Sequence, residues 1–157
     1  MNAIIEISND CESHWVPEHS LCEKWLNSAL DTANQDEPVH ISLSFVDLNT
    51  SAELNGQYRN KQSATNVLSF PAEFPNSLSE QLQFTPLGDI VVCPAIVEQE
   101  ASAQEKELQA HWAHLLVHGL LHLLGYDHES EECAQRMENL EKNALERLGF
   151  PDPYLIG

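Results

Sequence analysis

The stretch from 109 to 124 constrains the fold of this chain more than any other part of its sequence. It is apolar almost all round, which is typical of a helix buried in a core, yet it also carries histidines. At about 100° per residue they fall within an arc of about 80°: His111, His114, His118 and His122. A row of imidazoles on an apolar helix is costly unless each ring is paired, solvated or bound to metal. We therefore expect a buried central helix with one polar edge.

Three histidines at the end of this helix have the spacing of a metal site. His118 and His122 are one helical turn apart, so both can direct a ring nitrogen at one centre. In HGLLHLLGYDH, Gly125 lets the chain turn and return His128 to the same side. This spacing matches the zinc motif HExxHxxGxxH, and three neutral imidazoles leave a fourth tetrahedral position open for water. We expect a catalytic zinc centre, with Asp127 or a backbone carbonyl accepting the second N–H of a ligand ring.

One position departs from the protease form of that motif. The residue after the first ligand is Gly119, where metalloproteases carry their general-base glutamate. Peptide hydrolysis by the usual route is therefore not expected, and a different base or a different substrate is needed. A metal-dependent peptidase or amidase stays open as an alternative. A further alternative is that these histidines bind no metal and are ordinary interior or surface residues with hydrogen-bond partners.

Acidic residues strongly outnumber basic ones. Seven Lys and Arg against 25 Asp and Glu give a formal net charge of −18. This argues against a broad basic surface for nucleic acid or anionic lipid, although one positive pocket is compatible with it. Lys24, Arg59 and Lys61 are the only basic residues before position 106. Arg59 can bind a phosphate through two N–H groups and Lys61 as a point charge, or both can simply solvate a helix end.

Length and composition suit one domain spanning 1–157. The chain is 42% hydrophobic, enough to bury a core. It has no apolar run of about 18 residues and no signal-peptide pattern at its start, so we expect a cytoplasmic protein without a membrane segment. The cysteines share no metal or disulfide spacing, and we interpret them as reduced, mostly packing thiols: Cys11, Cys22, Cys93 and Cys133.

Residue periodicity predicts strands and helices without a regular βαβ rhythm. A capping box at Thr50–Glu53 is expected to open the second helix, and Ser130 to cap the last one. The buried stripe of that last helix is expected to be Cys133, Met137, Leu140, Ala144 and Leu148. The polar stretch between 72 and 87 is expected to be a mobile loop or a functional flap. The class is α+β, a small mixed sheet packed with helices, with these elements: strands at 4–7, 39–45, 67–70 and 88–93; helices at 18–35, 50–59, 94–108, 109–124 and 131–148.

Three separated segments resemble, in the right order, the signatures of the YbeY family, which are bacterial endoribonucleases of rRNA maturation. LNGQYRNKQSATNVLSFP at 54–71 resembles the first signature, LGDI at 87–90 the second, and HLLVHGLLHLLGYDH at 114–128 the third. The ending LGFPDPY is similar to the family's tail. Cys93 departs mildly, since the family often carries serine after the LGDI strand.

The resemblance implies a zincin-like central helix and a zinc-type ion held by His118, His122 and His128. It also implies functional roles for Arg59, which we expect to stabilise charge on a phosphate, and for His114. His114 could transfer a proton or orient substrate, or it could merely pack. The implied activity is single-strand-directed RNA cleavage in rRNA maturation, at the 16S 3′ end, and in ribosome quality control.

Two points stay open at the sequence level. Either a water on the metal or the RNA's own 2′-hydroxyl could attack, and a non-catalytic ribosome-associated factor with a structural metal would share the same histidines. The acidity bears on the partner, because tight binding to bare RNA requires many contacts between phosphates and Lys or Arg. We therefore expect weak binding to naked rRNA precursor, and delivery by the ribosome or a small-subunit-associated protein.

Overall fold

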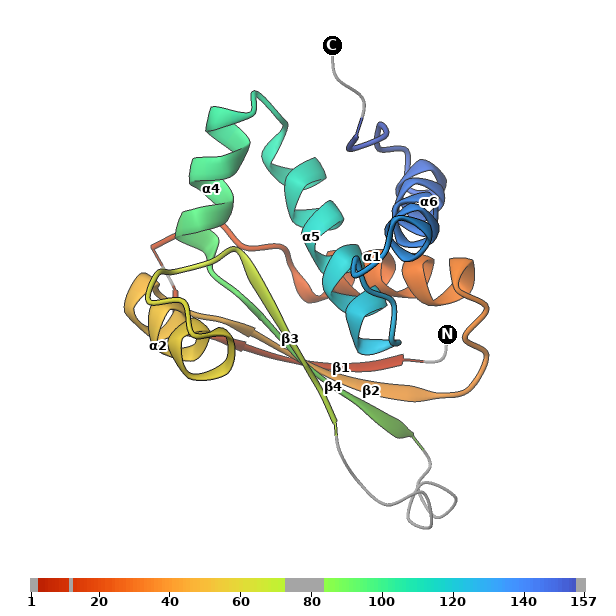
Figure 1. Cartoon of the computed structure of the whole chain (residues 1–157), viewed down its shortest axis with the longest axis horizontal. Helices are drawn as coiled ribbons and strands as arrows, with labels where there is room; N and C mark the ends of the chain where they lie inside the picture. Colours follow the sequence, from red (N-terminus) through yellow and green to blue (C-terminus); the bar gives the residue numbers. More distant parts are fainter. Residues whose placement is uncertain (1–2, 12, 73–83, 155–157) are drawn as a thin grey trace.

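A mixed sheet of four strands forms the frame of the molecule (Figure 1), in a computed structural model that describes residues 3–11, 13–72 and 84–154. The strand order is β1-β2-β4-β3, with β1, β2 and β4 parallel and β3 antiparallel to β4. The strands are β1 Ala3–Asn9, β2 Val39–Phe45, β3 Val67–Pro71 and β4 Thr85–Val92. This arrangement confirms the expected small mixed sheet.

Helices cover the sheet unequally (Figure 1). The main core joins α1 (His19–Thr32), α5 (Leu108–Leu123) and α6 (Glu131–Arg147) to one face of the sheet. A small second cluster on the other face packs against α2 (Leu48–Arg59). The helix α4 (Pro94–Ala103) follows β4 and leads to α5. These helices and the sheet confirm the α+β class.

The buried central helix is α5. Ten of its sixteen residues are buried, and it packs against α1, α4, α6 and the strands β3 and β4. Beneath the helices, the apolar residues of β2 alternate with half-buried polar ones, so that this strand presents its hydrophobic side to α5. In the part of the chain that the structure describes, no helix is long and apolar enough to span a membrane.

Three helix boundaries differ from the sequence prediction by two residues or more. α1 ends at Thr32 and not at 35. α2 begins at Leu48 and not at a Thr50 capping box, because the Asp47 side chain accepts the Thr50 N–H at 2.8 Å. α4 ends at Ala103, five residues before the expected 108, where Glu105 takes a left-handed φ of 54°. Of the predicted loop between 72 and 87, Thr85 to Leu87 belong to β4, and 73–83 lie outside the described residues.

The helix α6 confirms its Ser130 cap, whose side chain accepts the Cys133 N–H at 3.1 Å. The prediction that Cys133 lies on the buried stripe is wrong, because burial along this helix begins only at Met137. The acidic residue Glu141 lies on that stripe instead. The other three cysteines are buried free thiols, as expected of packing residues: Cys11, Cys22 and Cys93.

Candidate metal centre

The end of α5 brings two imidazoles together, and the turn after it adds a third. The Nε2 atoms of His118 and His122 are 3.1 Å apart, and one ring nitrogen of each of the three histidines lies within 4.8 Å of the others. Two nitrogens bound tetrahedrally to zinc at about 2.0–2.1 Å are about 3.3 Å apart. The ring of His128 stacks on that of His118, with centroids 5.0 Å apart. The donors and their spacing therefore fit one zinc-type ion.

The turn that returns His128 depends on Gly125. This glycine has a φ of 102°, and the N–H of Tyr126 donates to the Leu121 carbonyl at 3.0 Å, as in a Schellman C-cap. The ring of His122 also donates a hydrogen bond to the backbone of Tyr126. The glycine thus ends the helix and directs the chain back toward its own last turn.

Burial lowers the pKa of His122, and the neighbouring His118 and His128 lower it further. The ring is therefore neutral around pH 7, which is the form that binds a metal ion. Of the three histidines, His118 and His122 are half-buried and His128 is exposed.

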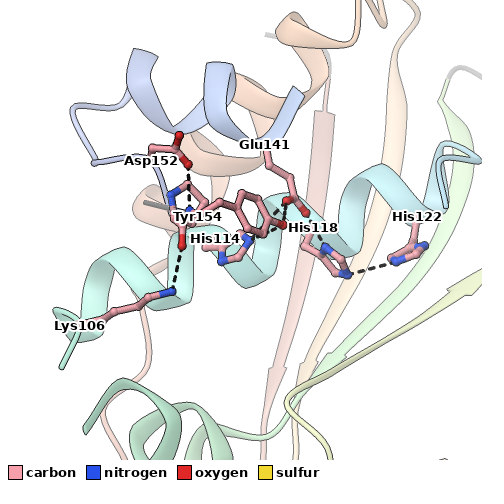
Figure 2. A network of polar contacts seen from close by, with 8 residues as sticks. Lys106, His114, His118, His122, Glu141, Asp152 and Tyr154 are labelled. Carbon is pink, nitrogen blue, oxygen red and sulfur yellow. Dashed lines mark hydrogen bonds and ion pairs between the residues drawn. The ribbon is translucent and has the colours of Figure 1, made fainter. Parts of the chain in front are cut away.

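The second nitrogen of His118 contacts a buried carboxylate from α6 (Figure 2). Its Nδ1 lies 2.5 Å from Oε1 of Glu141, whose side chain is fully buried. Burial raises the pKa of Glu141, but hydrogen bonds and charge from His114 and His118 outweigh it and hold the pKa at about 2. Asp127, the carboxylate expected from the sequence, accepts the N–H of Glu129 at 3.1 Å instead.

A pocket of about 750 Å³ opens over the three imidazoles. Arg59, the last residue of α2, lines the same pocket together with β3 residues. Lys61 lies on the exposed segment that follows the helix. The lining residues are Tyr58, Arg59, Thr65, Asn66, Val67, Leu68, Ser69, Phe70, Pro71, His118, His122 and His128. The structure therefore brings together four of the five site residues predicted from the sequence.

The fifth predicted residue, His114, faces a neighbouring pocket of about 330 Å³. Its Nε2 lies 3.4 Å from both Oε2 of Glu141 and the hydroxyl of Tyr154 (Figure 2). The two pockets share three lining residues: Asn66, Val67 and His118. His114 thus lies outside the pocket of the three imidazoles, beside His118, which lines both pockets.

The remaining histidine of the row, His111, is buried in a polar network. Its Nε2 lies 2.9 Å from Oε1 of Glu100, which also accepts an N–H of Asn66 at 3.0 Å. Burial lowers the pKa of His111, although the hydrogen bond to Glu100 opposes this. Three histidines elsewhere in the chain also have partners: His14 with Glu98, His19 with the Ile5 carbonyl and His40 with Glu6.

Gly119 is explained by packing against the sheet. A Cβ here would lie 3.1 Å from Ile90 Cγ2, 3.2 Å from Ser69 Oγ and 3.3 Å from Val67 Cγ2. The Ser69 hydroxyl also donates to the Gly119 carbonyl at 2.8 Å. The helix approaches β3 and β4 so closely that even a Cβ at this position would require neighbouring side chains to move by a few tenths of an ångström, so the general-base glutamate of metalloproteases fits poorly there.

Sequence reasoning missed Glu141 and Tyr154. Glu141 lies four residues after Met137, so it occupies a position of the apolar stripe of α6, and a lone acid on such a stripe signals a buried partner. The Tyr154 hydroxyl donates to Oε2 of Glu141. Burial and that carboxylate raise the pKa of Tyr154, so the hydroxyl keeps its proton.

The chain is similar to known endoribonucleases over most of its length. The family model described as endoribonuclease YbeY matches residues 6–149. A relative from Cellvibrio japonicus named endoribonuclease YbeY is 45% identical over 150 residues, 96% of this chain and 82% of that protein. A relative of the same name from Pseudomonas putida is 51% identical over 138 residues, which are 88% of this chain and 85% of that protein. A solution structure of a Thermotoga maritima protein superposes with a TM-score of 0.57 at 25% sequence identity. The superposition covers 98% of this chain and 100% of that protein.

Proposed function

The chain belongs to the YbeY family of endoribonucleases, and from that premise we propose that it cleaves RNA with a zinc-type ion held by His118, His122 and His128. One observation carries the proposal, namely that the three imidazoles and Arg59 line a single pocket. The role of the family is rRNA maturation, so the proposed substrate is a single-stranded segment of an rRNA precursor, such as the 16S 3′ end.

The residues present suit such an ion. The donor set is three imidazole nitrogens, which is typical of catalytic zinc sites with an open position. When bound, the ion supplies Lewis-acid polarisation of a phosphoryl oxygen and of water. The chain contributes the orientation of its own donors, because the Nδ1 of His118 contacts Glu141 and its Nε2 is directed toward His122.

Arg59 is the proposed phosphate-binding residue. Its guanidinium is the only strong cation among the residues that line the pocket, within the described part of the chain. A guanidinium binds two phosphate oxygens at once and stabilises the charge that develops on them during cleavage. Among the described residues that line the pocket there is no carboxylate, so this cation has no acidic partner in the pocket lining.

His114 is proposed to act on the nucleotide beside the cleaved bond. Its neighbouring pocket adjoins the first one at His118, so RNA that fills both pockets passes its ring. In that position the imidazole can accept or donate a proton at the RNA. Metalloproteases use a glutamate for proton transfer, and this chain has Gly119 at the corresponding position.

The proposal is tested with purified protein and a defined single-stranded rRNA precursor, with metal content measured in parallel. We expect Arg59→Ala to lower the cleavage rate about 10²–10³-fold, as loss of one charge-stabilising donor does. His118→Ala should lose both metal and cleavage, whereas Lys24→Ala, on the remote helix α1, is the matched control for loss of a cation. Equal cleavage by wild type, Arg59→Ala and His118→Ala would overturn the proposal.

The ends of the products distinguish the two possible attacking groups. Attack by the 2′-hydroxyl leaves a 2′,3′-cyclic phosphate, whereas attack by water leaves a linear phosphate. Replacement of the 2′-hydroxyl by hydrogen at the cleaved position should abolish cleavage only in the first case.

We further propose that RNA reaches the pocket on the ribosome or on a small-subunit protein. The net charge of −18 repels a polyanion, and broad salt-dependent adhesion requires many cationic contacts. We expect weak binding to naked RNA at physiological salt and faster cleavage on small-subunit particles. Tight binding to naked RNA would contradict delivery without affecting the cleavage proposal.

A further inference from the structure

A hydrogen-bond network with a buried centre connects the candidate metal ligand His118 to α6 and the C-terminal segment (Figure 2). Its centre is Glu141, whose side chain has no exposed surface. Oε1 lies 2.5 Å from Nδ1 of His118, and Oε2 accepts the hydroxyl of Tyr154 and lies 3.4 Å from Nε2 of His114. Both carboxylate oxygens are therefore engaged.

Tyr154 is itself held in place by the segment that carries it. The Asp152 side chain accepts the Tyr154 N–H at 2.8 Å, and Nζ of Lys106 donates to the Pro153 carbonyl at 3.3 Å. These contacts attach the end of the chain to the turn before α5 (Figure 2). The hydroxyl is thus fixed over the oxygen of Glu141 that faces away from His118.

We propose that Glu141, fixed by the Tyr154 hydroxyl, is a positioning residue that orients His118 for metal binding. The inference rests on the proposed metal site. An acceptor at Nδ1 places the ring proton there, so the lone pair is at Nε2, the atom that lies 3.1 Å from Nε2 of His122. A carboxylate in this position also makes the imidazole a stronger donor and fixes its rotation.

A direct ligand role for Glu141 is less compatible with the geometry. One atom each of His114, His118 and Glu141 lie within 4.8 Å of one another, which would permit a second ion. However, the nitrogen of His118 nearest to Glu141 is at hydrogen-bond distance, and Tyr154 donates to the other oxygen. A hydrogen-bonding carboxylate explains both contacts without an ion.

The test measures zinc affinity by chelator competition, with the melting temperature of the metal-free protein as a second readout. Glu141→Gln keeps the shape and one acceptor but removes the charge, and Tyr154→Phe removes only the hydroxyl. Glu146→Gln, an exposed acid on the same helix, is the control. We expect affinity to fall about 10-fold or more in Glu141→Gln and by a smaller factor in Tyr154→Phe. It should stay unchanged in the control, and all metal-free melting temperatures should agree within a few degrees.

The outcomes separate this inference from the proposed function. If wild type binds no zinc, the proposed metal site fails and the inference falls with it. If wild type binds one ion and Glu141→Gln binds it equally well, the site stands and the positioning role is overturned. Two ions per wild-type chain, one of them lost in Glu141→Gln, would make Glu141 a ligand and also overturn it. If Glu141→Gln does not fold, Tyr154→Phe decides, and unchanged affinity there overturns the inference.

Discussion

The two halves of the histidine row on α5 differ in their partners. In the first half, His111 and His114 are each within hydrogen-bond reach of a carboxylate, from Glu100 and Glu141. In the second half, His122 has another imidazole as its nearest side-chain partner and faces an open pocket. His118 belongs to both, since one nitrogen contacts Glu141 and the other contacts His122. The same residue type on one helix face is thus paired with a carboxylate or left open to a pocket according to what the rest of the fold places beside it.

The largest effect is expected where α5 touches the sheet between these halves. Gly119→Glu would bury a charged side chain against Ile90, Ser69 and Val67, at a cost of about 3 kcal/mol or more. The matched control is Gly56→Glu in α2, where a Cβ meets only the Lys61 carbonyl, at 3.9 Å. Chemical denaturation compares the two variants with wild type. A well-folded Gly119→Glu protein with peptidase activity would contradict our account of this glycine.

The next effect separates the two halves directly. His122→Ala removes a proposed ligand, so zinc affinity should fall by more than about 100-fold, beyond the 10–100-fold typical of an outer partner. His111→Ala, three turns earlier on the same helix, should bind zinc like wild type. Isothermal titration of the metal-free proteins measures both. Comparable losses of zinc affinity in the two variants would show that all four histidines contribute to metal binding, and would contradict the difference between the two halves of the row.

The smallest effect concerns the pH dependence of the first half. Burial lowers the pKa of His111 below its ordinary value of 6.5, so between that value and the lowered pKa the unfolded chain binds the proton first. The stability that neutral His111 contributes is complete above 6.5 and is lost as the pH falls toward the lowered pKa. In metal-free protein, the free energy of unfolding should therefore fall less between about pH 7.5 and 5.5 in His111→Gln than in wild type. Identical falls would mean that His111 does not titrate differently in the folded state.

Most of the elements were predictable because their signals are local. Strict alternation predicted β2, and the apolar run predicted α5 to within one residue at either end. Errors arose where two local signals competed, as at α2, where Asp47 caps the helix and Thr50 lies in its first turn. The prediction that Cys133 lies on the buried stripe of α6 was wrong because periodicity does not show at which residue a helix begins to contact its packing partner.

The metal motif was predictable for the same reason, whereas its surroundings were not. A helix places His118 and His122 one turn apart whatever surrounds it, and Gly125 signals the turn that returns His128. By contrast, the position of Arg59 beside these rings depends on how α2, β3 and α5 are packed. The resemblance to a family indicated a functional role for Arg59. Only the folded structure shows that Arg59 lines the same pocket as the three histidines.

By itself the sequence determined the spacing of the imidazoles, the buried character of their helix and the absence of a carboxylate at position 119. Only the tertiary structure decided which nitrogen of His118 is directed into the pocket, because its partner Glu141 lies 23 residues away on another helix. It also supplied the reason for the glycine, since only the packed sheet shows how little space remains at Gly119. Backbone hydrogen bonds and helical periodicity act within a few residues, whereas the orientation and protonation of a ring depend on groups that are close only in the folded chain.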